Sequence, residues 1–163
     1  MSADAETTQK LRQEQIQEIL AGCINGSEHL HRASLGDLLS TDGVVLIAEA
    51  GKAYWLIDAV ASYQGSLRRR KDWDAINRLA IWRLDVFNLP TQEPPCERWV
   101  HGYQRRFNRD FGGEVGHASA LLTMRLDTDT PVLVEQWIPY TDFPCHEIEL
   151  WTSNGVLMCP REY

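Results

Sequence analysis

The sequence of 163 residues lacks the apolar runs that membrane-spanning proteins need. No stretch of about eighteen apolar residues occurs anywhere in it, so no transmembrane helix is expected. The first six residues are acidic and contain neither a positively charged segment nor an apolar one, which argues against a secretory signal peptide. We therefore predict a cytoplasmic protein that does not bind membranes.

Motifs of common catalytic and cofactor sites are also missing. No G-x-S-x-G, Walker-type or Rossmann glycine pattern is present, so acyl transfer and nucleotide hydrolysis have no support. Four cysteines (Cys23, Cys96, Cys145 and Cys159) are far apart, and none pairs with another cysteine or histidine at the spacing of a zinc finger. We predict free, buried thiols, no metal site, no cofactor and no enzymatic activity.

The composition indicates one folded domain. Apolar residues make up 44% of the chain and six of its residues are tryptophans, which favours a packed globule over disorder. We predict a single domain over 1–163, with 1–7 disordered. The formal net charge of -7 disfavours general binding to a phosphate backbone and leaves open an acidic face for a basic partner.

The N-terminal half carries the periodicity of helices. A first helix is predicted from Thr7 or Thr8 to Ala21, ended by Gly22, and a short second helix after Ser27. The strongest helical pattern runs over 44–64 and ends before a glycine. It rests on apolar residues at steps of three and four, namely Leu46, Ala50, Ala53, Ile57 and Val60.

The period changes from 3.6 to 2 in the C-terminal half. Alternating apolar residues predict strands over 79–87, 118–127 and 132–140, and a hairpin over 148–159 that turns at Asn154-Gly155. Helices followed by strands, without alternation of the two, indicate an α+β fold. We expect N-terminal helices packed on a C-terminal antiparallel β-meander of four or five strands.

A long segment, 88–117, separates the first two predicted strands. Because a structureless loop of this length is uncommon in a compact domain, we predict an inserted helix over 97–111. Four aromatic residues recur there at steps of four and would form one ridge on a helix. The predicted partner-binding residues are this ridge and its neighbouring arginines: Trp99, Tyr103, Arg105, Arg106, Phe107, Arg109 and Phe111.

Three interpretations of this segment remain open. The ridge could pack on the protein's own sheet, or bind a protein groove or a second copy of the chain. Aromatic rings interleaved with arginines could also bind single-stranded nucleic acid, by stacking on bases and holding phosphates. The acidic net charge weighs against nucleic acid.

Several short strings in the sequence are familiar as an ordered set. They comprise 39–44 (LSTDGV), 53–58 (AYWLID), 82–84 (WRL), 140–144 (YTDFP) and 160–163 (PREY). In this order they resemble an uncharacterised bacterial family, a domain of unknown function similar to DUF6876, whose members occur on plasmids, phages and integrated elements. The resemblance covers about 26–87 and 118–163. It implies an accessory role on a mobile element and supplies no activity.

Asp42, Asp58 and Asp142 are the acidic residues inside the familiar strings. They could form a secondary binding surface, or the acid–base site of a small enzyme if they converged in a cleft. A turn or a helix cap is the plainer explanation of Asp42 and Asp142, and we favour structural roles for these carboxylates. Our functional prediction is a non-enzymatic protein-interaction module of a mobile element that binds and inhibits a host defence or regulatory protein. A nucleic-acid-binding protein and a small enzyme are the alternatives.

Overall fold

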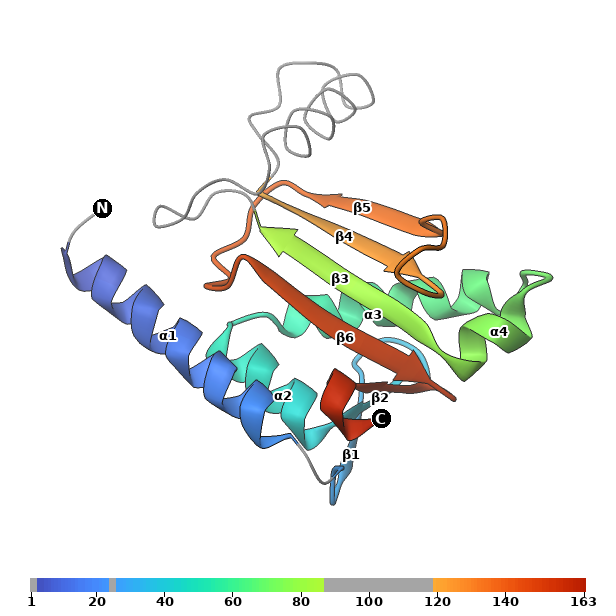
Figure 1. The fold of residues 1–163 in the computed structure, drawn as a ribbon, viewed down its shortest axis with the longest axis horizontal. Coiled ribbons are helices and arrows are strands. Elements are labelled where there is room, and N and C mark those ends of the chain that lie inside the picture. Colours follow the sequence, from blue (N-terminus) through green and yellow to red (C-terminus); the bar gives the residue numbers. More distant parts are fainter. Residues whose placement is uncertain (1–2, 24–25, 87–118) are drawn as a thin grey trace, which may run out of the picture.

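The protein is described by a computed structural model, in which residues 3–23, 26–86 and 119–163 are placed (Figure 1). Its helices and strands follow one another in an order that confirms the α+β class. The helices are α1 (Ala3–Gly22), α2 (Asp42–Ala50), α3 (Tyr54–Leu67), α4 (Trp73–Arg78) and the short 3-10 helix η1 (Pro160–Glu162). The strands are β1 (Leu30–Arg32), β2 (Leu39–Thr41), β3 (Ala80–Val86), β4 (Ala120–Arg125), β5 (Val134–Ile138), β6 (Glu147–Ser153) and β7 (Val156–Met158).

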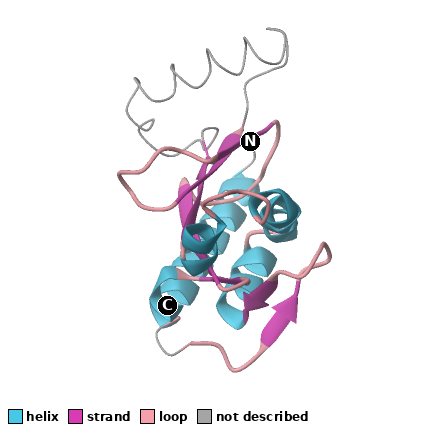
Figure 2. Cartoon of the chain, turned by 90° about the vertical axis from the view of Figure 1, so that its right-hand side faces the viewer, coloured by secondary structure: helices cyan, strands magenta, loops and turns pink. Residues whose placement is uncertain are grey.

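The strands form one seven-stranded sheet in the order β1-β2-β7-β6-β3-β4-β5. The five C-terminal strands are antiparallel to one another, as predicted, and the sheet departs from the predicted meander in two details. Strand β6 returns to pair with β3 and not with β5, and β2 pairs with β7 in parallel. The two short strands that the prediction missed, β1 and β2, lie at the lower end of the molecule in both views (Figures 1 and 2).

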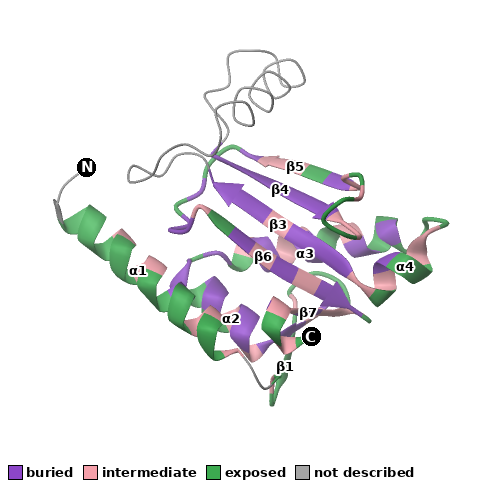
Figure 3. Cartoon of the chain, in the orientation of Figure 1, coloured by how far each residue is buried: buried purple, intermediate pink, exposed green. Residues whose placement is uncertain are grey.

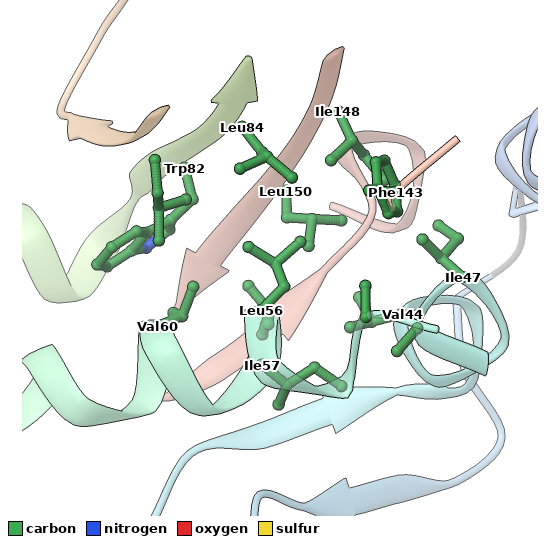
Figure 4. Close-up of a cluster of buried hydrophobic side chains, with 14 of the residues drawn as sticks. Val44, Ile47, Leu56, Ile57, Val60, Trp82, Leu84, Phe143, Ile148 and Leu150 are labelled. Atoms are coloured by element: carbon green, nitrogen blue, oxygen red, sulfur yellow. The ribbon is translucent and has the colours of Figure 1, made fainter. Parts of the chain in front are cut away.

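The core lies between the sheet and helices α2 and α3. Figure 4 shows apolar side chains of both helices reaching the sheet residues Trp82, Leu84, Ile148 and Leu150. Trp82 is fully buried, and its indole N–H donates to the Thr152 hydroxyl at 3.1 Å. Helix α1 instead exposes most of its residues (Figure 3) and packs against α2 through Ile16.

The short helix predicted after Ser27 is a hairpin of β1 and β2. Leu30 pairs with Thr41 and Arg32 with Leu39 across it. The residues that join the strands include Gly36, whose φ of +70° lies in the left-handed region that a helix cannot contain. The prediction rested on the leucines at positions 30, 35, 38 and 39, and short apolar patterns of this kind fit a helix and a strand alike.

The predicted long helix over 44–64 is two helices with a break between them. Lys52 adopts a φ of +51°, which ends the helical hydrogen-bond pattern after α2. Thr41 begins α2 as its N-cap, with its hydroxyl accepting from Val44 N. Helix α3 continues past Gly65 to Leu67, and α4 follows where the sequence pattern predicts no helix.

The turn predicted at Asn154-Gly155 is confirmed. Both residues have positive φ, +49° and +80°, as a type I′ turn between antiparallel strands requires. Helix α1 begins at Ala3, earlier than predicted. The predicted helix over 97–111 lies outside the described residues. No helix in the described part of the chain is long and apolar enough to cross a membrane.

Candidate functional site

The N-terminal end of α2 gathers polar groups from three separate segments. Asp42, the first residue of the helix, accepts hydrogen bonds from His31 Nε2 at 2.6 Å and from the Ser27 hydroxyl at 2.8 Å. The backbone N–H of His29 donates to the same carboxylate at 3.1 Å. The bond from His31, with smaller contributions from Ser27 and His29, lowers the pKa of the Asp42 carboxyl to about 2. Asp42 is therefore ionised at neutral pH and holds β1 against α2.

Next to this network a cleft of about 290 Å³ opens between the β1–β2 hairpin and helices α2 and α3. The hairpin supplies His31, Arg32, Ser34 and Ser40 to its lining, and α3 supplies Tyr54 and Asp58. Val45 of α2 and Ile57 of α3 add an apolar part. The cleft thus combines hydroxyl, imidazole, carboxylate and aromatic groups in a space that fits one side chain.

Ser40 is a buried residue whose hydroxyl is unsatisfied. The residue is 1% exposed, and its Oγ has no hydrogen-bond partner within the described ranges. Leaving a buried hydroxyl unpaired costs about 1–3 kcal/mol, and such groups in folded proteins call for an explanation. Because Ser40 lines the cleft, a ligand with a polar group could supply the missing bond.

Asp58 carries the uncompensated charge of the cleft. Its carboxylate accepts a hydrogen bond from the Ser34 hydroxyl and forms no ion pair with the residues that are placed. The basic residues of the lining are already engaged, since Arg32 lies 2.6 Å from the Asp37 carboxylate and His31 binds Asp42. The net electrostatic character of the cleft is therefore acidic.

Ser40, His31 and Asp42 have the side chains of a Ser–His–Asp catalytic relay, but the hydrogen bond from serine to histidine that such a relay needs is not formed. His31 and Ser40 are cross-strand partners, and His31 is bonded to Asp42. A nucleophilic serine needs a hydrogen bond to the imidazole, and the Ser40 hydroxyl makes none to any described residue.

The opposite end of α2 holds Asp142 in a different environment. Arg12 of α1 donates from Nε to Ala50 O at 3.0 Å and from Nη2 to Gly51 O at 2.7 Å, which satisfies carbonyls at the end of the helix. Arg12 Nη1 lies 3.4 Å from the Asp142 carboxylate. The neighbouring Phe143 is fully buried and packs against Gly51. A Cβ added at Gly51 would lie only 2.5 Å from the Phe143 ring.

A family model described as a family of unknown function, DUF6876, matches residues 14–163. The chain belongs to this family. Comparisons with curated proteins and with solved structures found no match. The match to DUF6876 therefore confirms the resemblance seen in the sequence and brings no activity with it.

Three of the strings that carry the resemblance to DUF6876 lie at the two ends of α2. The string 39–44 forms the N-terminal end, where Thr41 Oγ1 donates to Glu162 of the string 160–163 at 2.7 Å. The string 140–144 closes the C-terminal end through Phe143. Packing and capping thus explain much of this pattern, and the string 53–58 adds Tyr54 and Asp58 to the cleft.

The structure does not bring the three predicted carboxylates together. Asp42 binds the β1 segment, Asp58 lines the cleft and Asp142 binds Arg12 of α1. Sequence reasoning missed His31 and Ser40, which belong to a hairpin that was taken for a helix. The predicted partner-binding residues Trp99, Tyr103, Arg105, Arg106, Phe107, Arg109 and Phe111 lie outside the described residues and stay a prediction.

Proposed function

We propose that this chain is a non-enzymatic protein-interaction module, and that the cleft between the β1–β2 hairpin and α3 receives a basic side chain of a partner protein. The observation that carries the proposal is the pairing of an unsatisfied hydroxyl, Ser40, with an uncompensated carboxylate, Asp58, in one cleft. A lysine or arginine side chain would bind Asp58 by a charge-assisted hydrogen bond and could donate a second bond to Ser40.

Tyr54 supports a cationic guest as well. Its ring lines the cleft, and half of the residue is exposed. A guanidinium or ammonium group within about 6 Å of an aromatic face is attracted by the ring quadrupole. The formal charge of -7 on the whole chain favours approach by a basic partner and opposes docking of a second, equally acidic copy.

Exposed apolar residues in the elements that form the cleft support a protein as the source of that side chain. Leu30 precedes His31 in β1, Leu35 follows Ser34 in the hairpin, and Leu46 follows Val45 in α2; each is about half exposed. Large apolar residues that stay exposed in these elements are available for a protein contact. If the chain acts from a mobile element, as the resemblance implied, the partner would be a host defence or regulatory protein.

Site-specific photo-crosslinking in cells tests this proposal. We would place p-benzoylphenylalanine at position 54 in the cleft and, as a matched control, at position 140, an exposed tyrosine on the segment that leads to Phe143. The expected result is a covalent adduct from position 54 alone, with the crosslinked segment of the partner containing lysine or arginine by mass spectrometry.

Asp58→Asn provides the second arm of the experiment. The substitution keeps the size of the side chain and an acceptor for Ser34 but removes the charge, so the adduct should fall about tenfold or more, in line with the loss of a charged hydrogen bond. Equal adducts from positions 54 and 140 would overturn the proposal. An adduct whose yield does not change in Asp58→Asn would also overturn it. The same holds if the crosslinked segment is acidic, or if the crosslinked protein is a second copy of this chain.

A further inference from the structure

Two cysteines and a glutamate from distant parts of the sequence meet beside the N-terminal end of α2. Cys23 follows α1, Cys159 lies between β7 and η1, and Glu162 ends η1. Their two sulfur atoms and a carboxylate oxygen all lie within 4.8 Å of one another. We propose that Cys23, Cys159 and Glu162 form a binding site for a zinc ion, with a water molecule as the fourth ligand.

The donor atoms have the chemistry and the spacing of a zinc site. Zinc takes thiolate sulfur at about 2.3 Å and carboxylate oxygen at about 2.0–2.2 Å in a tetrahedron. Those bond lengths place neighbouring donor atoms about 3.5–3.8 Å apart. A limit of 4.8 Å between the donors means that small side-chain shifts suffice to bind the ion.

Gly43 leaves the space that the three donors face. A Cβ added at this residue would lie 2.5 Å from Cys23 Sγ, 3.0 Å from Glu162 Oε1 and 3.2 Å from Cys159 Sγ. The three donor atoms thus lie together over Gly43, and a side chain at residue 43 would collide with Cys23 Sγ. Gly43 stands in the first turn of α2 without a positive φ, so its backbone conformation does not require glycine.

Glu162 is held in the orientation that a metal ligand needs. Its Oε2 accepts from Thr41 Oγ1 at 2.7 Å and from Cys159 N at 2.8 Å. The other oxygen, Oε1, is the one that faces Gly43. Hydrogen bonds that anchor one oxygen of a ligating carboxylate fix the direction of the other and strengthen metal binding.

Without the ion the site is a pair of protonated thiols. Burial is the main cause that raises the pKa of both Cys23 and Cys159, and the nearby Glu162 carboxylate raises both further. Zinc binding would release the two thiol protons to solvent and leave two thiolates and the carboxylate around a doubly charged cation. No oxidation or reduction takes place. The first N–H groups of α2 lie beside the cluster and favour the remaining negative charge.

Cobalt titration of the reduced, metal-stripped full chain tests the site. We expect one Co²⁺ per chain, with the near-ultraviolet absorption of a thiolate–cobalt bond, displacement by Zn²⁺, and proton release into a weakly buffered solution. Cys23→Ser and Cys159→Ser should each weaken binding by more than about 100-fold, beyond the usual effect of losing an outer-shell partner. Glu162→Gln should weaken it less and keep the thiolate absorption.

Matched controls distinguish this site from other thiols. Cys96→Ser and Cys145→Ser should bind cobalt as the wild type does, and zinc should raise the melting temperature of these variants but not of Cys23→Ser. Because Cys23 is only half-buried, Cys23→Ser should fold even if Cys159→Ser does not. Cobalt binding by Cys23→Ser then tests the site. Absence of thiolate–cobalt absorption in the folded wild type would overturn the proposal. Undiminished binding by Cys23→Ser would also overturn it.

Discussion

The two ends of helix α2 differ in how completely their polar groups are satisfied. At the C-terminal end Arg12 donates to the carbonyls of Ala50 and Gly51, and Phe143 fills the space beside Gly51. At the N-terminal end Asp42 is satisfied, whereas, among the described residues, the nearby Ser40 hydroxyl has no partner and Asp58 forms no ion pair. One end is closed by packing, and the other opens on a cleft.

This difference separates residues that stabilise the fold from residues that are available to a ligand. Interactions at the closed end are complete, so substitutions there should change stability and leave binding unchanged. Unsatisfied groups at the open end cost stability in the isolated protein, and that cost is expected where a partner completes the site.

Phe143→Ala should have the largest effect on stability. The side chain is fully buried between α2 and the sheet (Figure 4), and deleting a buried aromatic ring leaves a cavity that costs about 3–5 kcal/mol. Urea unfolding followed by circular dichroism would measure the loss. Tyr140→Ala, which removes a ring that is 78% exposed, is the control and should change the free energy of unfolding by less than about 0.5 kcal/mol.

Arg12→Ala should lower the free energy of unfolding by about 2 kcal/mol, because two carbonyls lose a charged donor. The same unfolding measurement applies. Lys10→Ala, which removes an exposed surface pair with Glu14, should change stability by about 0.5 kcal/mol at most. Equal effects of the two substitutions would contradict the role given to Arg12.

Asp42→Asn should make stability less sensitive to acid. The Asp42 pKa is about 2 in the folded protein, below its ordinary value of 3.8, so the carboxylate contributes stability above pH 4 and loses that contribution as the pH falls through 2. The variant should therefore be less stable than the wild type at pH 7, and the difference should shrink toward pH 2. A difference in unfolding midpoint that stays constant over this range would argue against the network around Asp42.

Ser40→Ala should have the smallest effect on stability and a clear effect on binding. Removing an unpartnered buried hydroxyl should leave the free energy of unfolding unchanged or raise it by up to about 1 kcal/mol. Thr41→Val is the matched control, because it removes a hydroxyl that caps α2 and donates to Glu162, and should cost about 1 kcal/mol or more. A destabilisation by Ser40→Ala as large as that by Thr41→Val would contradict the assignment of an open hydroxyl.

The sequence predicted those parts of the fold that depend on local patterns. The alternation of apolar and polar residues located strands β3 to β6. The pair Asn154-Gly155 specified the turn between β6 and β7, because the positive φ angles of that turn suit these residue types. Local patterns did not reveal the break at Lys52, which adopts a left-handed conformation without being glycine. Leucine spacing also could not distinguish the β1–β2 hairpin from a helix.

The candidate site was harder to predict because it depends on contacts between distant segments. Asp58 was named, yet its place beside Ser40 follows only from the hairpin packing on α3. Similarly, Cys23 and Cys159 have no spacing that suggests a shared site, and the sheet brings the C-terminal end back to α1. Asp42, Asp58 and Asp142 all lie in strings that resemble DUF6876, but the structure places them in three separate environments.

The most direct test of the open cleft is an NMR titration of the labelled protein with N-acetyl-arginine amide, which carries one guanidinium group. Our account predicts saturable shifts of the backbone amides of Ser34, Ser40, Tyr54 and Asp58, no shifts around Phe143, and loss of the response in Asp58→Asn. Shifts spread evenly over the surface, or unchanged shifts in Asp58→Asn, would contradict the claim that this cleft receives a basic side chain.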